Sequence, residues 1–256
     1  MQVCCAASPP LVGYRCLKFH IYPRYFVTHS LILQLSEGST EQSVELVIKD
    51  LVIAGWTGRD TDALEKHIAE LEAIGVPRPP TVPCFYRVSA ALLTTSDVIQ
   101  ASGPDSSGEV EFVLYGSDQG MLIGVGSDHT DRRVETYDVT VSKQMCFKPV
   151  SASVWRLDDV LPHWDQLVLR SWAVVHGERR LYQEGPVTVM RAPDDLISRW
   201  MGGGETLPAG AAMYCGTLAV HGGIAAAEKF ELELSDPVLD RSIRHDYAII
   251  DLPFDS

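Results

Sequence analysis

Three acidic side chains near the middle of the chain have the type and the spacing to bind a metal ion. Glu109 and Glu111 lie two residues apart in the segment 109–114, where apolar residues alternate with the acids and predict a β-strand. Residues two apart on a strand point to the same side, so these carboxylates repel each other unless a cation lies between them. A hairpin turn at residues 118–120 would return the chain, with Asp128, to the same edge. The sequence therefore indicates a cluster of carboxylates around one cation.

The cation that suits this cluster is a hard one, because all the ligand atoms are oxygens. Mg²⁺ is the first expectation, and Mn²⁺ or Ca²⁺ would also fit. Asp131 and His129 are alternative ligands if one of the carboxylates points elsewhere. The competing interpretation is a solvated strand face with scattered acids, on which Asp128 merely begins a polar turn.

A second pair of side chains could activate water. His67 and Glu70 lie three residues apart in a segment with helical periodicity, so they can share one face of a helix. A carboxylate beside an imidazole orients the ring and raises its basicity, which makes a general base. The alternative is that His67 is a packed core residue on the apolar stripe of the helix and that Glu70 is a solvated acid.

These side chains need a framework, and the sequence predicts many short strands with few helices. Asp60 predicts the N-cap of a helix that runs to about Ile74, where Gly75 would end it. The prolines within residues 77–83 then break any helix and mark a connector. Strands and helices do not alternate regularly, so we expect an α+β fold dominated by a mixed β-sheet. The other expected strands are 31–35, 43–48, 51–54, 167–175, 179–183, 211–220, 229–234 and 247–252, and the other expected helices are 157–164 and 193–201.

The first thirty residues differ from the rest of the chain. They contain Arg15, Lys18 and Arg24 but no acidic residue, in a protein whose net charge is −13. Residues 1–30 are therefore expected to be a poorly ordered leader, or the product of a start codon assigned too far upstream. Residues 31–256 would form one domain, with a small N-terminal part up to residue 80 and a β-rich core from residue 81.

Charge and composition exclude several classes of protein. A net charge of −13 argues against binding to nucleic acid or to an anionic membrane surface. No apolar run in the sequence is long enough to cross a bilayer. The six cysteines include no Cys-x-x-Cys pair, which argues against a zinc site or a disulfide framework. We expect a soluble, cytoplasmic protein.

The order of these segments resembles the fumarylacetoacetate hydrolase superfamily. The resemblance is carried by residues 83–90, by the Glu-x-Glu strand within residues 108–112, by Asp128 with Arg132 four residues later, and by Lys143 ahead of Pro149. In that family a Glu-x-Glu strand and a later Asp bind Mg²⁺ or Mn²⁺, which implies the ligands Glu109, Glu111 and Asp128. The resemblance covers residues 31–256, and within the superfamily the chain is most similar to an uncharacterised prokaryotic branch. It implies a mixed β-sheet roll with few short helices.

The resemblance also implies catalytic roles. His67 and Glu70 match a water-activating His-x-x-Glu dyad that many members carry ahead of the metal strand. Lys143 matches a cation that faces the substrate and stabilises an enolate, and Lys148 is the competing candidate for this role.

Four further residues are implied to contact the substrate or to hold the metal loop. Arg132 would pair with an acid or support the loop, and Arg87 would add positive charge from the strand after Pro83. Gly216 and Thr217 resemble a Gly-Thr turn that binds a substrate carboxylate through a close backbone approach, an N–H group and a hydroxyl.

Three hypotheses for the function follow. The first is a metal-dependent hydrolase that cleaves a carbon–carbon bond in a small β-diketo or 2-oxo acid. The second keeps the metal but changes the reaction to dehydration, decarboxylation or keto–enol tautomerisation through an enolate. The third is a non-catalytic β-rich binding protein, in which the three carboxylates do not cluster. For the enzyme we expect Mg²⁺ or Mn²⁺ as cofactor, a small anionic keto acid as substrate and a homodimer.

Overall fold

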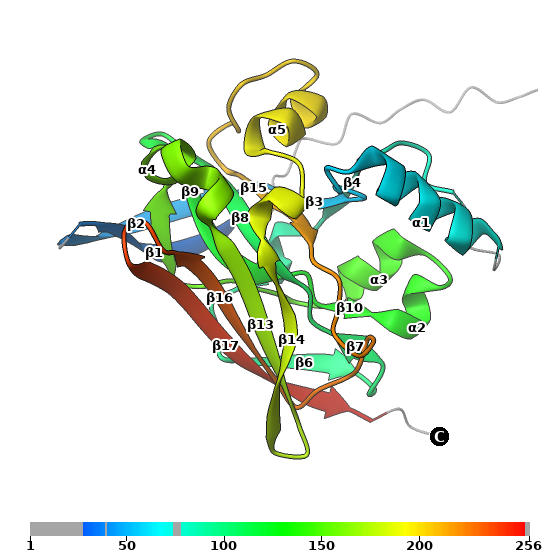
Figure 1. The fold of residues 1–256 in the computed structure, drawn as a ribbon. Coiled ribbons are helices and arrows are strands. Elements are labelled where there is room, and N and C mark those ends of the chain that lie inside the picture. The colour runs from blue at the N-terminus through cyan, green and yellow to red at the C-terminus, as the bar shows by residue number, and fades with distance from the viewer. Residues whose placement is uncertain (1–27, 39, 74–77, 254–256) are drawn as a thin grey trace, which may run out of the picture.

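The computed structural model describes residues 28–38, 40–73 and 78–253, apart from the side chains of residues 67, 70, 71 and 73. About half of the described residues lie in strands, and most of these strands form two sheets that face each other (Figure 1). The expected β-dominated α+β fold, a curled mixed sheet with few short helices, is confirmed.

The larger sheet has eight strands in the order β2-β1-β12-β9-β8-β15-β3-β4. The pairs β1–β12 and β15–β3 are parallel, and the other neighbouring pairs are antiparallel. β1 and β3, which lie in the part of the chain up to residue 80, pair in this sheet with strands from beyond residue 80. Its strands are β1 (His29–Glu37), β2 (Thr40–Ile48), β3 (Asp50–Gly55), β4 (Cys84–Val88), β8 (Val110–Ser117), β9 (Gly120–Ser127), β12 (Ser153–Arg156) and β15 (Ala211–Thr217).

The smaller sheet has five strands in the order β14-β13-β16-β17-β6, with a parallel pair only between β17 and β6. Its strands are β6 (Val98–Ser102), β13 (Val168–Val175), β14 (Glu178–Pro186), β16 (Lys229–Asp236) and β17 (Arg241–Leu252). Two short ladders complete the described strands: β10 (Thr130–Asp131) with β7 (Ser106–Ser107), and β11 (Lys148–Pro149) with β5 (Leu93–Thr94).

The helices are short and lie around the sheets (Figure 1). Asp60 caps the first of them, since its carboxylate accepts the N–H groups of Asp62 and Ala63; the expected end at Ile74 and Gly75 lies outside the described residues. The α-helices are α1 (Thr61–Ala73), α2 (Arg132–Glu135), α3 (Val139–Met145), α4 (Leu157–Val160) and α5 (Pro193–Met201), and the 3-10 helices are η1 (Ala90–Leu92), η2 (Leu161–Gln166) and η3 (Val187–Val189). Among the described helices, none combines the length and the apolar character that a membrane crossing requires.

Two of the α-helices were not expected from the sequence. The polar stretch after Asp128 forms α2 and α3, which pack against each other and against β10. Each begins with an aspartate cap, because Asp131 accepts the N–H of Val134 and Asp138 accepts the N–H of Val141. These helices matter for function, because α2 begins with Arg132 and α3 contains Lys143.

The expected elements differ from the observed ones mainly at their ends. β1 begins at His29 rather than at residue 31, because His29 and Ser30 pair with Ile48 and Val47. β15 ends at Thr217 rather than at residue 220, β17 begins at residue 241 rather than 247, and the helix expected over 157–164 is α4 followed by η2. Residues 1–27, which make up most of the expected leader, lie outside the described residues.

The hairpin formed by β8 and β9 lies in the middle of the larger sheet and is almost wholly buried. Val110 and Phe112 face the apolar core between the two sheets, whereas Val113 and Tyr115 belong to a second apolar cluster. Side chains alternate along a strand, so Glu111 shares its face with Val113 and Tyr115. A carboxylate on this face is therefore surrounded by protein rather than by water.

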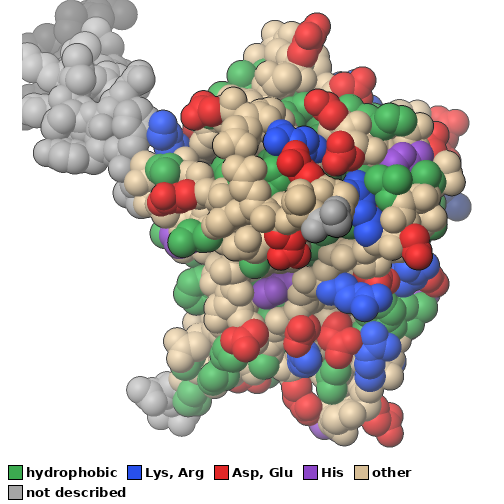
Figure 2. Space-filling model, turned by 90° about the vertical axis from the view of Figure 1, so that its left-hand side faces the viewer, with side chains coloured by type: hydrophobic (Ala, Val, Ile, Leu, Met, Phe, Trp, Pro, Cys, Tyr) green, Lys and Arg blue, Asp and Glu red, His purple; other side chains and the backbone are tan. Residues whose placement is uncertain are grey.

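The surface carries acidic and basic side chains side by side. On the face shown in Figure 2, Asp and Glu are interspersed with Lys and Arg, and hydrophobic side chains form small groups. The excess of acidic residues, 34 against 21 basic ones, is therefore not gathered into one patch on this face.

Candidate metal centre

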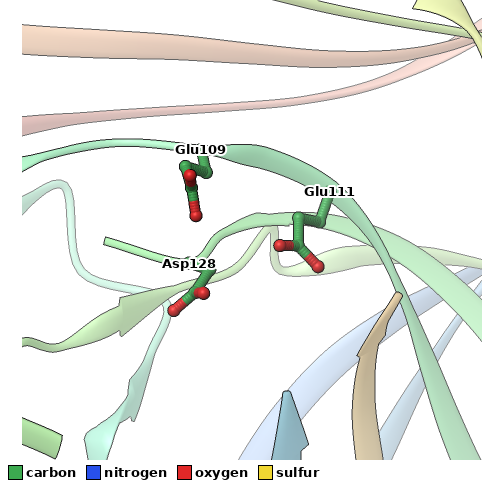
Figure 3. Close-up of side chains that lie close together, drawn as sticks. All are labelled: Glu109, Glu111 and Asp128. Atoms are coloured by element: carbon green, nitrogen blue, oxygen red, sulfur yellow. The ribbon is translucent and has the colours of Figure 1, made fainter. Parts of the chain in front are cut away.

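Glu109, Glu111 and Asp128 meet at one end of the β8–β9 hairpin (Figure 3). Glu109 directly precedes β8, Glu111 is its second residue, and Asp128 follows the last residue of β9. The strand register pairs Val110 with Ser127, and the N–H of Asp128 donates to the carbonyl of Glu109 at 3.0 Å. As a result, one carboxylate oxygen of each acid lies within 4.8 Å of the others. The structure thus brings together the three residues that the sequence indicates as ligands.

These carboxylates are removed from water. Glu111 is 2% exposed, Asp128 is 1% exposed, and the Glu109 side chain is 18% exposed. The interpretation of Glu111 and Asp128 as solvated acids is therefore wrong. Burial raises the pKa of Glu111 well above its ordinary value and the charges of Asp128 and Glu109 raise it further, against the opposing effects of a backbone hydrogen bond and of Lys143. A cation between the three acids would remove this penalty.

Lys143 approaches the carboxylates from α3. Its Nζ atom forms an ion pair with Oδ2 of Asp128 and lies 3.9 Å from Oε2 of Glu109 and 6.0 Å from the centre of the Tyr86 ring. Burial alone would lower the pKa of Lys143, but the charges of Asp128 and Glu109 raise it above the ordinary value. The ammonium group therefore stays charged at the edge of the cluster, where a developing negative charge could use it.

Lys148 contacts the same aspartate from the protein interior. Its side chain is fully buried, and Nζ lies 3.2 Å from Oδ1 of Asp128. The ammonium group also donates to the carbonyl oxygens of His129 at 2.6 Å and Cys146 at 3.2 Å. Burial by itself would raise the pKa of Asp128, but Lys143 and Lys148 together lower it to about 2. Asp128 is thus ionised without any added cation.

Arg132 holds the third carboxylate. Its guanidinium lies 3.1 Å from Oε1 of Glu109, donates to the hydroxyl of Ser107 at 2.6 Å and donates to Glu135 at 2.9 Å. The contact with Glu109 agrees with the expectation that Arg132 pairs with an acid. Whether it also contacts substrate stays a prediction.

Gly216 and Thr217 secure β8 from the neighbouring strand β15. The N–H of Gly216 donates to Oε2 of Glu111 at 2.6 Å, and the hydroxyl of Thr217 donates to the carbonyl of Val110 at 2.8 Å. Gly216 has a φ of +100°, and a Cβ atom there would lie 1.7 Å from Oγ1 of Thr57. Only glycine fits this position, and its N–H is used to orient Glu111. The substrate-binding role expected for both residues stays a prediction.

The remaining candidates lie elsewhere or are used otherwise. Arg87 forms an ion pair with Asp50 on the exposed side of the sheet and not with the carboxylate cluster. Both ring nitrogens of His129 are within hydrogen-bond distance of other buried groups, and burial lowers its pKa to about 3. Asp131 caps α2. Neither alternative ligand therefore joins the carboxylates. The side chains of the expected dyad, residues 67 and 70 of α1, lie outside the described residues.

The donor set fits a hard divalent cation. All three donors are carboxylates, and Oδ1 of Asp128 is buried and makes no hydrogen bond beyond its ion-pair contact with Lys148. Oxygen-only sites of this kind suit Mg²⁺, Mn²⁺ or Ca²⁺. Glu109, Glu111 and Asp128 are the residues that would hold the ion.

The fold is shared with several solved structures. A fumarylacetoacetate hydrolase family protein from yeast superposes with a TM-score of 0.57 at 17% identity, over 81% of this chain and 95% of that one. A candidate fumarylacetoacetate isomerase/hydrolase from Oleispira antarctica gives 0.60 at 16% identity, over 85% and 99%. A candidate fumarylpyruvate hydrolase from Burkholderia cenocepacia gives 0.56 at 17% identity, over 90% and 100%. The resemblance inferred from the sequence is therefore confirmed for the fold.

Two comparisons concern the sequence itself. A family model described as "protein of unknown function (DUF2848)" matches residues 54–247. No protein with a curated description matches the chain.

Replacing Glu111 by Gln should stabilise the metal-free protein and remove its response to metal. The pKa of Glu111 is raised in the folded state, so its deprotonation costs the folded protein more free energy than the unfolded chain. The free energy of unfolding of the wild type therefore falls as the pH rises from the ordinary pKa of a glutamate through the folded pKa. Gln cannot ionise, and its carbonyl can still accept from Gly216. With EDTA we expect Glu111→Gln to melt like the wild type near pH 5 and above it at pH 8, whereas Mg²⁺ should raise only the wild-type melting temperature. Parallel pH curves for the two proteins would contradict the raised pKa.

Replacing Lys148 by Met should destabilise the protein strongly. Met has a similar length but no charge, so Asp128 loses a buried partner and two carbonyl groups lose their donor. Breaking a buried ion pair from one side costs about 3–5 kcal/mol, which urea unfolding can measure. The control is Lys49→Met, because Lys49 is exposed and such changes stay within about 0.5 kcal/mol. Equal losses in the two variants would show that Lys148 is not needed to balance Asp128.

Proposed function

The chain belongs to the DUF2848 family of proteins of unknown function. We propose that it is a divalent-metal-dependent enzyme acting on a small β-diketo or 2-oxo acid. The proposed reaction is hydrolysis of a carbon–carbon bond. The observation that carries the proposal is the buried group of Glu109, Glu111 and Asp128 with the ammonium of Lys143 at its edge.

The fold supports the choice of substrate class. The relatives from Oleispira antarctica and Burkholderia cenocepacia are named for fumarylacetoacetate and fumarylpyruvate. Both are β-diketo compounds with a carboxylate, which a metal can chelate through adjacent oxygens. A divalent cation held by the three carboxylates would act as a Lewis acid that polarises such a substrate.

Lys143 is proposed to stabilise the negative charge that develops when the carbon–carbon bond breaks. The electron pair of that bond stays on the carbon beside the 2-oxo group and spreads to its oxygen as an enolate. A fixed ammonium group in a water-poor site stabilises such a charge more than water does, because it needs no reorganisation. The pKa of Lys143 is raised by its carboxylate neighbours, so it acts as a charged hydrogen-bond donor and not as a base.

Water activation is assigned to α1. His67 and Glu70 lie three residues apart on this helix, and His67 would remove a proton from the water that attacks the carbonyl carbon while Glu70 orients the ring. The hydroxyl group of the water stays on the attacked carbonyl carbon, which becomes a carboxylic acid, and the proton returns to the enolate carbon, which gives the keto product.

A second candidate, dehydration, decarboxylation or tautomerisation through an enolate, needs no hydrolytic water. It is supported by the fact that the carboxylates and Lys143 are together in the described part of the chain, and they suffice for enolate chemistry. We further propose a homodimer in the cytoplasm, which light scattering and cell fractionation can test.

The proposal is tested by an activity screen with Mg²⁺ or Mn²⁺ over acylpyruvates, oxaloacetate and sugar-derived 2-oxo acids, with identification of the products. The matched control is Glu111→Gln, which changes one ligand with little change in shape. We expect turnover that EDTA abolishes and the variant lacks. Turnover that survives both treatments, or calorimetry that finds no metal binding below millimolar concentrations, would rule out the metal mechanism.

His67→Ala and Glu70→Ala choose between the two enzyme hypotheses. Loss of a general base typically lowers the rate by about 10²–10⁴-fold. A hydrolase should lose about that much in each variant, with metal affinity and melting temperature nearly unchanged. A decarboxylase or tautomerase should lose far less. If His67 is only a packed core residue, His67→Ala should melt early and Glu70→Ala should resemble the wild type.

A further inference from the structure

A chain of buried hydrogen bonds passes beside the three carboxylates without touching their oxygens. Oγ of Ser106 lies 2.8 Å from Nε2 of His129, and Nδ1 of His129 lies 3.0 Å from the hydroxyl of Tyr247. The Tyr247 hydroxyl lies 2.8 Å from Oγ of Ser127. The same Ser127 oxygen accepts the N–H of Glu109 at 3.1 Å. The chain thus joins β7, β17 and β9 and ends on the backbone of a carboxylate-bearing residue.

The hydrogen bonds of this chain can run in one of two directions. If the Tyr247 hydroxyl donates to Ser127, its oxygen accepts from Nδ1 of His129, and Nε2 accepts from the hydroxyl of Ser106. If the hydroxyl of Ser127 donates to Tyr247, the Tyr247 hydroxyl donates to Nδ1, and Nε2 donates to Ser106. In both directions His129 is neutral and held in a single tautomer.

Packing leaves this chain no room to shift. Ser127, His129 and Tyr247 are completely buried, and the Tyr247 ring lies edge-on to the imidazole with 5.6 Å between centres. A Cβ atom on Gly108 would lie 2.6 Å from the Tyr247 hydroxyl and 3.0 Å from Oγ of Ser127. The backbone before Glu109 can approach the chain this closely only because residue 108 is glycine.

Two carboxylate-bearing residues are fixed by this arrangement. Asp128 stands between Ser127 and His129, so both of its neighbours are anchored in the chain. Its own N–H donates to the carbonyl of Glu109 at 3.0 Å. A loss of the Tyr247 hydroxyl would therefore loosen Glu109 and Asp128 together, while Glu111 stays bound to Gly216.

We propose that Tyr247 and His129 are positioning residues of the metal centre, which hold Glu109 and Asp128 at the separation that a divalent cation requires. The inference rests on the metal site of the proposed function. Neither residue is a ligand, and Tyr247 acts from the C-terminal strand through Ser127. Groups that orient metal ligands from behind are typically worth 10–100-fold in metal affinity.

The test compares Tyr247→Phe with Tyr182→Phe. Tyr182 is another buried tyrosine of the same aromatic group, and its hydroxyl accepts the N–H of Ala225 without contact to the carboxylates. Calorimetry with Mg²⁺ and with Mn²⁺ alone should show about tenfold weaker binding for Tyr247→Phe and unchanged binding for Tyr182→Phe. Tyr247→Phe leaves two buried groups without their partner, so its melting temperature should fall further than that of Tyr182→Phe, and metal affinity is the readout that decides.

Unchanged metal affinity in Tyr247→Phe, whatever its melting temperature, would overturn the inference and leave only a structural role. If that variant does not fold, Ser127→Ala removes the same link and must weaken metal binding. Nitrogen-15 NMR of the metal-free wild type should show His129 neutral and in one tautomer; a mixture of the two tautomers would show that the chain is not ordered and would also overturn the inference. A wild type with a single tautomer that binds no metal would instead show that the proposed function has failed, and the positioning role with it.

Discussion

Three carboxyl groups can be held within a few ångströms of one another, away from water, only if positive charge surrounds them or a proton stays on one of them. In this protein Lys143, Lys148 and Arg132 supply that charge, each from a different short element. α3 carries the first, β11 the second and α2 the third. The segment after the β8–β9 hairpin, which contains α2, α3 and β11, therefore does more than connect strands. It is folded so that three cations converge on acids that the central hairpin brings together.

The strands of the sheet fix the positions of the three acids, and the three basic side chains offset their negative charge. Strand register fixes where Glu109 and Asp128 stand, because a shift by one residue would turn their neighbours to the other face. The adjacent strand β15 fixes Glu111 through the backbone of Gly216, where no larger residue fits. Backbone groups of paired strands lose little freedom on binding an ion, so most of the ordering cost is met when the protein folds.

The sequence predicted the features that local patterns encode. The alternation around Glu111 and the turn before Asp128 place both acids at one end of a hairpin, and Asp60 marks the start of α1 as expected. α2 and α3 were missed because each is only a few residues long, although the caps Asp131 and Asp138 were visible signals. The burial of Lys148 and the link from Tyr247 could not be predicted, because a lysine is usually exposed and no local pattern reports a partner more than a hundred residues away.

The separation along the chain between the parts of the site has a kinetic meaning. Glu109 and Asp128 are joined by a hairpin, whose closure spans few residues and is fast. Gly216 is 105 residues from Glu111, and Tyr247 is 120 residues from Ser127, so these contacts close long loops and form late. We therefore expect a nascent chain to contain the acids as a pair well before it can coordinate an ion tightly. If the three acids bind an ion as proposed, an ion that arrives before the sheet is complete would meet flexible ligands and dissociate.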